Sequence, residues 1–154
     1  MQILALGFPR SAIDSLCFVL LTLGYSRVWH GFDLPSTRPE DGGSWVLLLQ
    51  AKARGEDKSG REFDWDVLLG DYDGVMDMLP GIFVKELLDF YPEVKVILDR
   101  RNNMDAWHRS SNVAAEMVLG SWGLWMLNWW DRKLFWWFRS AVLWTGIIGK
   151  GEDI

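Results

Sequence analysis

The residues with the clearest chemical potential lie between Gly7 and Ser15, directly after a short apolar segment. They read G-F-P-R-S-A-I-D-S and include Arg10 and the hydroxyl groups of Ser11 and Ser15. A guanidinium fork and hydroxyl donors suit the oxygens of a phosphate or a sulfate. The first N–H groups of a helix beginning here would lack partners within the helix and would carry partial positive charge. The pattern predicts an anion site, and a plain turn between a strand and a helix remains the structural alternative.

This segment differs from the phosphate-binding loop of ATP- and GTP-hydrolysing proteins. That loop, G-x-x-x-x-G-K-[ST], requires a second glycine and a lysine, and residues 7–15 contain neither in the required place. A nucleotide kinase or a nucleoside triphosphatase is therefore disfavoured.

Alternating strands and helices would place this segment at one edge of a parallel sheet. Strands are predicted at residues 2–6, 27–30, 74–76 and 94–98. Helices are predicted at residues 13–23, 44–54 and 80–91 and from residue 104 or 105, with a helical turn at 64–69 and a loop at 31–43. Gly24 is the predicted stop of the first helix, and Ser44 is a candidate cap. The fold class that follows is α/β, with helices on both faces of the sheet.

Composition restricts the class of partner. The 154 residues contain 16 Lys and Arg against 21 Asp and Glu, a net charge of −5, which disfavours nucleic acid. Cys17 is the one cysteine, and His30 and His108 are the two histidines, so neither a disulfide framework nor a metal site is expected. The apolar run before Pro9 is too short for a secretory signal, which predicts a cytoplasmic protein.

The last third of the chain is rich in tryptophan. Seven of the eleven tryptophans lie in residues 117–148: Trp122, Trp125, Trp129, Trp130, Trp136, Trp137 and Trp144. The charged residues 131–133 interrupt the stretch, which disfavours a membrane span of about 20 apolar residues. Two amphipathic helices packed on the core, or lying at a membrane surface, are the open alternatives. A protein partner or a homo-oligomer through residues 122–144 also stays open. The predicted domains are an α/β core at 1–116 and a helical extension at 117–154.

Four stretches, in order, resemble the P-loop sulfotransferases. Residues 7–16 resemble the phosphosulfate loop of that family, roughly G-F-x-R-[ST]-G-T-x-S-L. Residues 24–31 resemble G-Y-x-x-x-H, residues 63–80 resemble D-W-x-x-L…D-x-P, and residues 91–110 resemble Y-P-x-A-K-V-I-L-x-x-R…W-x-x-S. The resemblance covers about residues 1–115. It points to a subgroup abundant in fungi that is often labelled as P-loop NTP hydrolases or NAD-dependent epimerases.

The resemblance implies a P-loop-type three-layer sandwich and a function. The function is transfer of a sulfuryl group from 3′-phosphoadenylyl sulfate (PAPS) to a hydroxyl or an amine of a small molecule, such as one of secondary metabolism. The implied PAPS-binding residues are Gly7, Pro9, Arg10, Ser11, Ala12, Ile13, Asp14 and Ser15 at the phosphosulfate, with Arg101 (or Arg100) and Ser110 at the 3′-phosphate.

The resemblance also implies a base for the acceptor's proton. His30 is the implied base, and a histidine pKa near neutrality suits this task. Asp77 is the alternative base or an orienting group. The structural alternatives are a hydrogen-bonded histidine at the sheet edge and an aspartate that caps a helix.

Two residues depart from the family pattern, and a third adds an unfavourable charge. Ala12 replaces a glycine, which costs about 1 kcal/mol if this position needs a positive φ. Ile13 replaces a threonine, and a lost hydrogen bond to a charged group costs about 1.5–3 kcal/mol. Asp14 adds a negative charge near the anion. We expect PAPS binding to be weakened by about two to three orders of magnitude.

The chain is also expected to be short at its C-terminus, because residues 146–154 cannot supply the closing loop of the family. The alternative to an enzyme is therefore an inactive relative that acts as a binding or membrane-associated protein.

Overall fold

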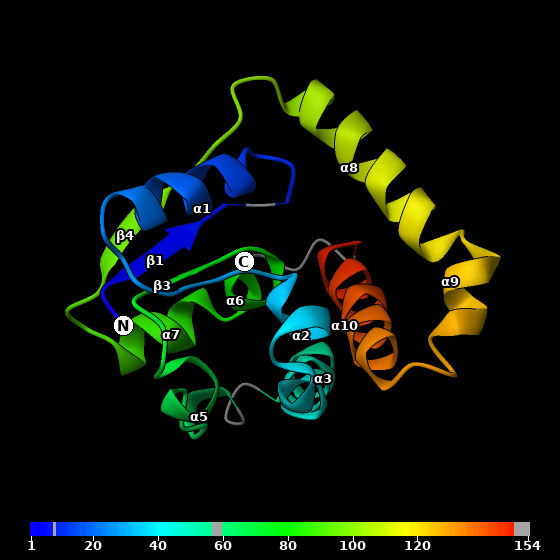
Figure 1. Ribbon diagram of the computed structural model, residues 1–154, viewed down its shortest axis with the longest axis horizontal. Coiled ribbons are helices and arrows are strands. Elements are labelled where there is room, and N and C mark those ends of the chain that lie inside the picture. The colour runs from blue at the N-terminus through cyan, green and yellow to red at the C-terminus, as the bar shows by residue number, and fades with distance from the viewer. Residues whose placement is uncertain (8, 57–59, 150–154) are drawn as a thin grey trace. The chain divides into compact units, whose positions relative to one another are not determined.

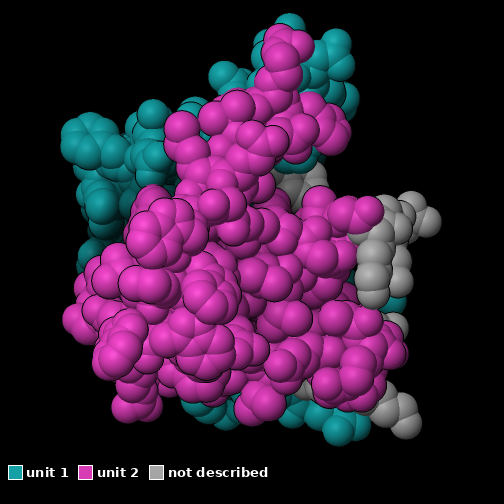
Figure 2. Space-filling model, turned by 90° about the vertical axis from the view of Figure 1, so that its right-hand side faces the viewer, with its two compact units in different colours: residues 1–31, 61–107 teal, residues 32–60, 108–154 magenta. Residues whose placement is uncertain are grey.

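The computed structural model describes residues 1–7, 9–56 and 60–149. The chain forms two compact units, one of residues 1–31 and 61–107 and the other of residues 32–60 and 108–154, coloured separately in Figure 2. The division into a core at 1–116 and an extension at 117–154 stays a prediction.

The first unit contains a four-stranded, fully parallel sheet. Its strands are β1 (Ile3–Leu6), β2 (Val28–Trp29), β3 (Gly74–Met76) and β4 (Lys95–Leu98), in the order β2-β3-β1-β4. Central β1 places Leu4 opposite Val75 of β3 and Val96 of β4. This arrangement confirms the predicted α/β fold class and all four predicted strands.

Helices lie on both sides of the sheet within the first unit (Figure 1). On one side, α1 (Ile13–Thr22) packs Ile13 and Leu20 against Ile3 and Ala5 of β1. On the other side lie α6 (Met78–Ile82) and α7 (Val84–Phe90). The alternation of side chains along β1 explains this division, since Ile3 and Ala5 point to one face and Leu4 to the other.

The predicted stop of the first helix is confirmed. Thr22 is the last residue of α1, and Gly24 follows with a φ of 99°. A residue with a side chain rarely adopts this left-handed conformation, whereas glycine does so at little cost. The short turn α5 (Asp66–Leu69) follows Trp65, which is fully buried against the ring of Phe83 at 5.2 Å. The D-W motif therefore supplies a core residue.

Two predicted elements were wrong in part. The predicted loop at 31–43 contains a short helix, α2 (Asp33–Ser36), and a 3₁₀ turn, η1 (Pro39–Asp41). Proline has the fixed φ that a first helical residue needs, so Pro39 starts this turn rather than breaking it. Consequently α3 (Gly42–Ala53) begins after Asp41, and Ser44 is not its cap.

The predicted helix at 80–91 is divided into α6 and α7. Phe83 has φ and ψ of −106° and 28°, outside helical values, and its ring is buried. The helix is therefore interrupted at Phe83, whose buried ring lies 5.2 Å from the ring of Trp65.

The second unit consists of helices. Besides α2 and α3, it contains α9 (Trp122–Leu127), α10 (Arg132–Gly149) and most of α8 (Met104–Leu119). The two helices α9 and α10 confirm the predicted Trp-rich helical segment, and α10 packs along α3 and α2.

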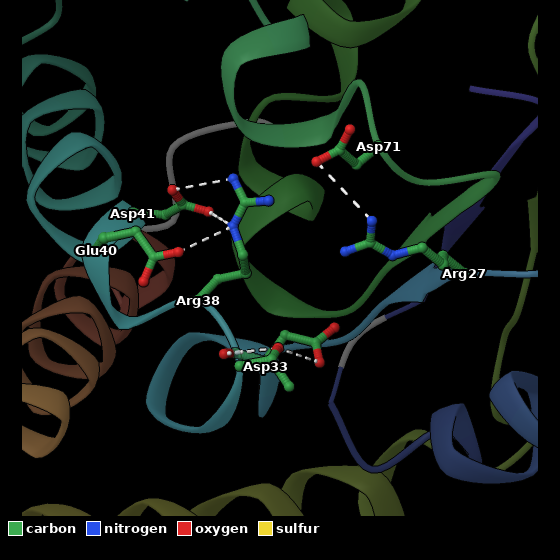
Figure 3. A network of polar contacts seen from close by, with 7 residues as sticks. Arg27, Asp33, Arg38, Glu40, Asp41 and Asp71 are labelled. Carbon is green, nitrogen blue, oxygen red and sulfur yellow. Dashed lines mark hydrogen bonds and ion pairs between the residues drawn. The ribbon is translucent and has the colours of Figure 1, made fainter.

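At η1, Arg38 Nε lies 2.8 Å from the buried carboxylate of Asp41 and 3.4 Å from Glu40 (Figure 3). In the part of the chain that the structure describes, no helix combines the length and apolar character that crossing a bilayer requires.

The contact between α3 and α10 requires a glycine at one position. A methyl group at Gly42 would overlap Cβ and Cγ of Trp136, atoms that side-chain rotation cannot move far. At Gly43, the next residue, a methyl group would meet Trp136 ring atoms only at 3.8 and 4.0 Å. The two neighbouring glycines therefore allow a matched comparison, because only a methyl group at position 42 would overlap Trp136.

We predict that Gly42→Ala lowers the free energy of unfolding by about 1–3 kcal/mol, the usual cost of overpacking. Gly43→Ala is the control and should be as stable as the wild type or more stable, because alanine forms helices better than glycine. Thermal unfolding of both variants measures the difference. A Gly42→Ala variant that melts at or above the wild-type temperature would contradict the observed packing.

Candidate functional site

A cavity of about 490 Å³ lies at the carboxyl edge of the sheet in the first unit. Each of the four strands is followed by at least one residue that lines it. The lining residues are Pro9, Arg10, Ser11, Ala12, Ile13 and Asp14 after β1, His30 after β2, Asp77 after β3, and Arg100, Arg101 and Asn102 after β4. Ligands of open parallel sheets bind in this kind of crevice.

The loop between β1 and α1 turns through two left-handed residues. Arg10 has a φ of 73°, and Ala12 has a φ of 72° and a ψ of 27°. The position of Ala12 therefore has the positive φ at which a glycine is favoured. Ala12 is also the N-cap of α1 and gives no side-chain cap, so the first N–H groups of the helix are left to another acceptor.

Two long-range hydrogen bonds hold this loop. The Nη1 of Arg101 donates to the carbonyl oxygen of Arg10 at 3.1 Å. The Nε1 of Trp107 donates to the carbonyl oxygen of Pro9 at 2.9 Å. The segment after β4 is thereby tied to the loop after β1. Three of the residues that line the cavity are arginines, at 10, 100 and 101, so the cavity offers positive charge to an anion.

Gly7 allows the loop to pass close to the end of β4. A methyl group at this position would lie 3.0 Å from Oγ of Ser11 and 3.2 Å from Cβ of Asp99. Within the described residues, Gly7 and Ser15 do not line the cavity, and Phe8 lies outside them. Gly7 is thus placed as a packing residue of the loop.

His30 lies between two carboxylates. Its Nε2 is 3.2 Å from Oδ1 of Asp14, and its Nδ1 is 3.7 Å from Oδ2 of Asp77. The side chains of His30 and Asp77 are 15% and 13% exposed, whereas that of Asp14 is 86% exposed. A buried carboxylate on one nitrogen of an imidazole can fix the ring while the other nitrogen exchanges a proton.

Asp77 is held in a strained conformation. Its φ of 81° and ψ of −171° fall in a region that glycine occupies almost alone, and such strain concentrates at functional positions. Its Oδ2 accepts a hydrogen bond from the N–H of Gly31 at 3.0 Å. A methyl group at Gly31 would overlap this oxygen, so glycine is required there. Burial raises the pKa of Asp77, an effect partly opposed by His30 and the Gly31 N–H.

Some candidate residues are not brought together. Ser110 lies in α8, in the second unit, and is not among the described residues that line the cavity, so its contact with a 3′-phosphate stays a prediction. The structure leaves Arg100 and Arg101 both at the cavity.

Sequence reasoning missed Asn102, Gly31 and the anchoring role of Trp107, which had appeared only as part of a motif. Among the described residues, no three His, Cys, Asp or Glu side chains group as metal ligands would.

Comparison with known proteins identifies the family. The family model described as "Sulfotransferase domain" matches residues 2–153. The "Ava biosynthesis cluster protein M" of Aspergillus versicolor is 34% identical over 160 residues, which are 99% of this chain and 58% of that relative. The chain therefore belongs to the sulfotransferase family, as the four stretches predicted. It spans 58% of the length of this relative.

The left-handed conformation of Ala12 generates a prediction about stability. Ala12→Gly should raise the free energy of unfolding by about 1 kcal/mol, because glycine adopts a φ of 72° without the steric cost of Cβ. Ala115→Gly, in the middle of α8, is the matched control and should lower stability by about 1 kcal/mol. Denaturant unfolding of both variants provides the comparison. If Ala12→Gly is destabilised as much as the control, the loop does not turn as described.

Proposed function

We propose that this protein transfers a sulfuryl group from PAPS to a hydroxyl or an amine of a small molecule. The observation that carries the proposal is the meeting of three groups in one cavity: the N-terminus of α1, the arginines at 10 and 101, and His30. The first two suit a phosphosulfate, and the third suits an acceptor that must lose a proton.

The residues present fit the donor. Bound PAPS would supply a sulfuryl group activated by its bond to a phosphate. The N–H groups at the start of α1 would hold the phosphosulfate together with Arg10, whose guanidinium matches two of its oxygens. Arg101 or Arg100 would hold the 3′-phosphate. Fixed donors of this kind stabilise charge that develops during transfer.

The acceptor's proton would go to His30. Its Nε2 faces the exposed side of the site, and its Nδ1 faces the buried carboxylate of Asp77. Asp77 would hold the ring in position, with its own carboxylate fixed by the Gly31 N–H. In this proposal His30 is the base and Asp77 is the orienting group.

The similar fungal protein supports a small-molecule acceptor. Its name assigns it to a biosynthesis cluster. We propose by analogy that the acceptor here belongs to secondary metabolism. The alternative, an inactive relative that binds without transfer, is supported by Ala12, Ile13 and Asp14, each of which would weaken donor binding.

Titration with the desulfated donor, 3′-phosphoadenosine 5′-phosphate, tests the proposal. We expect binding by the wild type and a loss of about 10- to 100-fold in affinity for Arg10→Ala, the cost of a charged hydrogen bond. Arg61→Ala removes the same charge from an exposed position away from the cavity and should bind like the wild type. No heat of binding by the wild type at millimolar ligand would refute the proposed donor.

We propose attachment to a membrane surface as a second function, which does not require transfer. The side chains of Trp122 and Trp130 are 75% and 87% exposed, and Trp125 and Trp129 are more than half exposed. Arg132 and Lys133 follow after Asp131. Tryptophan beside basic residues is typical of helices that lie in the headgroup region of a bilayer. A protein partner or a second copy of the chain would cover the same residues.

Co-sedimentation with vesicles of phosphatidylcholine and phosphatidylserine tests this attachment. The wild type should sediment with the vesicles, and the double variant Trp122→Ala, Trp130→Ala should bind several-fold less, since each buried tryptophan contributes apolar area. Phe18→Ala removes an aromatic ring that is 71% exposed in the first unit and serves as the control. Wild-type protein that stays in the supernatant with both lipids would count against the membrane.

A further inference from the structure

We infer that the acceptor is a primary amine that arrives as an ammonium ion, and that Asp14 selects it. This inference rests on the proposed function and names the substrate class of the same site. It follows from the presence of a second carboxylate at His30, which a hydroxyl acceptor would not need.

The two carboxylates at His30 occupy different environments. Asp77 is buried on the Nδ1 side, where it can orient the ring. Asp14 is 86% exposed on the Nε2 side, 3.2 Å from the nitrogen that would receive the acceptor's proton. An incoming acceptor atom that reaches Nε2 must therefore come within contact distance of the Asp14 carboxylate.

The charge of the cavity is divided between two ends. Arg100 and Arg101 follow the edge strand β4, and Arg101 donates a hydrogen bond to the carbonyl oxygen of Arg10. His30 and Asp77 follow β2 and β3 on the other side of β1, and Asp14 lies 3.2 Å from His30. A carboxylate in the first turn of α1 opposes an anion bound at that helix end, but it attracts a cation beside the anion. The arrangement complements an anionic donor and a cationic acceptor together.

An alcohol and an amine differ at this point. A neutral hydroxyl would offer Asp14 one hydrogen bond, and Nε2 of His30 would compete for the same proton. An ammonium group has three N–H donors, so it can contact Asp14 and Nε2 at once through charge-assisted hydrogen bonds. Asp14 is therefore assigned as the specificity-determining residue of the acceptor end.

Transfer of the sulfuryl group to the amine forms one bond to sulfur, breaks one bond to sulfur and releases two protons. The ammonium loses one proton to Nε2 of His30, and its lone pair then forms a bond to sulfur. The bond between sulfur and the bridging oxygen breaks, and its electron pair stays on the 5′-phosphate of the leaving nucleotide. The nitrogen releases a second proton to solvent. The products are a sulfamate and 3′-phosphoadenosine 5′-phosphate.

Binding of a matched pair of probes tests the selection without turnover. The probes are 2-phenylethylamine and 2-phenylethanol, titrated by ligand-observed NMR into the full chain with 3′-phosphoadenosine 5′-phosphate present. The amine should bind about tenfold more tightly or better, and Asp14→Asn should reduce that preference about tenfold. Asp14→Glu should retain the preference. Asp89→Asn makes the same change of charge at an exposed site on α7 and should leave the preference unchanged.

Sulfation of the same two probes from PAPS separates the outcomes. The ratio of kcat/KM for the amine to that for the alcohol should exceed one in the wild type and should fall in Asp14→Asn. If the nucleotide binds and the alcohol is the better acceptor, the inference is overturned and the proposed function stands. If neither probe is sulfated and the nucleotide does not bind, the proposed function fails. If the preference for the amine is the same in the wild type and in Asp14→Asn, the inference is overturned, whether the preference is measured by binding or by sulfation.

Discussion

The carbonyl groups of Pro9 and Arg10 are fixed by donors that are more than ninety residues away in the chain. Trp107 and Arg101 supply these donors, and the conformation of the loop after β1 depends on them. With both carbonyls engaged, the chain turns through left-handed Arg10 and Ala12 and enters α1 without a side-chain cap. The turn leaves the start of the helix at the cavity, where an anion can bind.

The parallel sheet explains why so few residues can form a site. Because all four strands run in the same direction, their carboxyl ends meet at one edge, and each contributes a lining residue. The strands next to β1 deliver groups of opposite charge. Asp77 follows β3 on one side, and Arg100 and Arg101 follow β4 on the other. Strand order thus separates Asp77 from Arg100 and Arg101.

The sequence predicted the elements that depend on local signals. Short apolar runs marked the four strands, and Gly24 marked the end of α1. The helical turns at 33–41 were missed because Pro35, Pro39 and the paired glycines resemble a loop, while helices this short are stabilised by packing, here against α10.

In the candidate site, too, local signals identified residues, whereas contacts between distant residues could not be predicted. Arg10, His30, Asp77 and Arg101 could be named because each follows a predicted strand and matches a family motif. Their roles stay predictions. The contact of Asp14 with His30 depends on how α1 is rotated over the end of β2, and the bond from Trp107 to Pro9 spans 98 positions. No local pattern encodes such distances. The sequence indicated that Ala12 is unfavourable if its φ is positive, but only the structure shows that its φ is 72°.

We propose that the turn after β1 binds a sulfated nucleotide through its phosphosulfate end. A crystal structure of the protein with 3′-phosphoadenosine 5′-phosphate tests it most directly. We predict the 5′-phosphate within hydrogen-bonding distance of the N–H groups at the start of α1 and of the Arg10 guanidinium, with the 3′-phosphate near Arg100 or Arg101. A nucleotide bound away from this cavity, or a cavity that stays empty at saturating nucleotide, would contradict it.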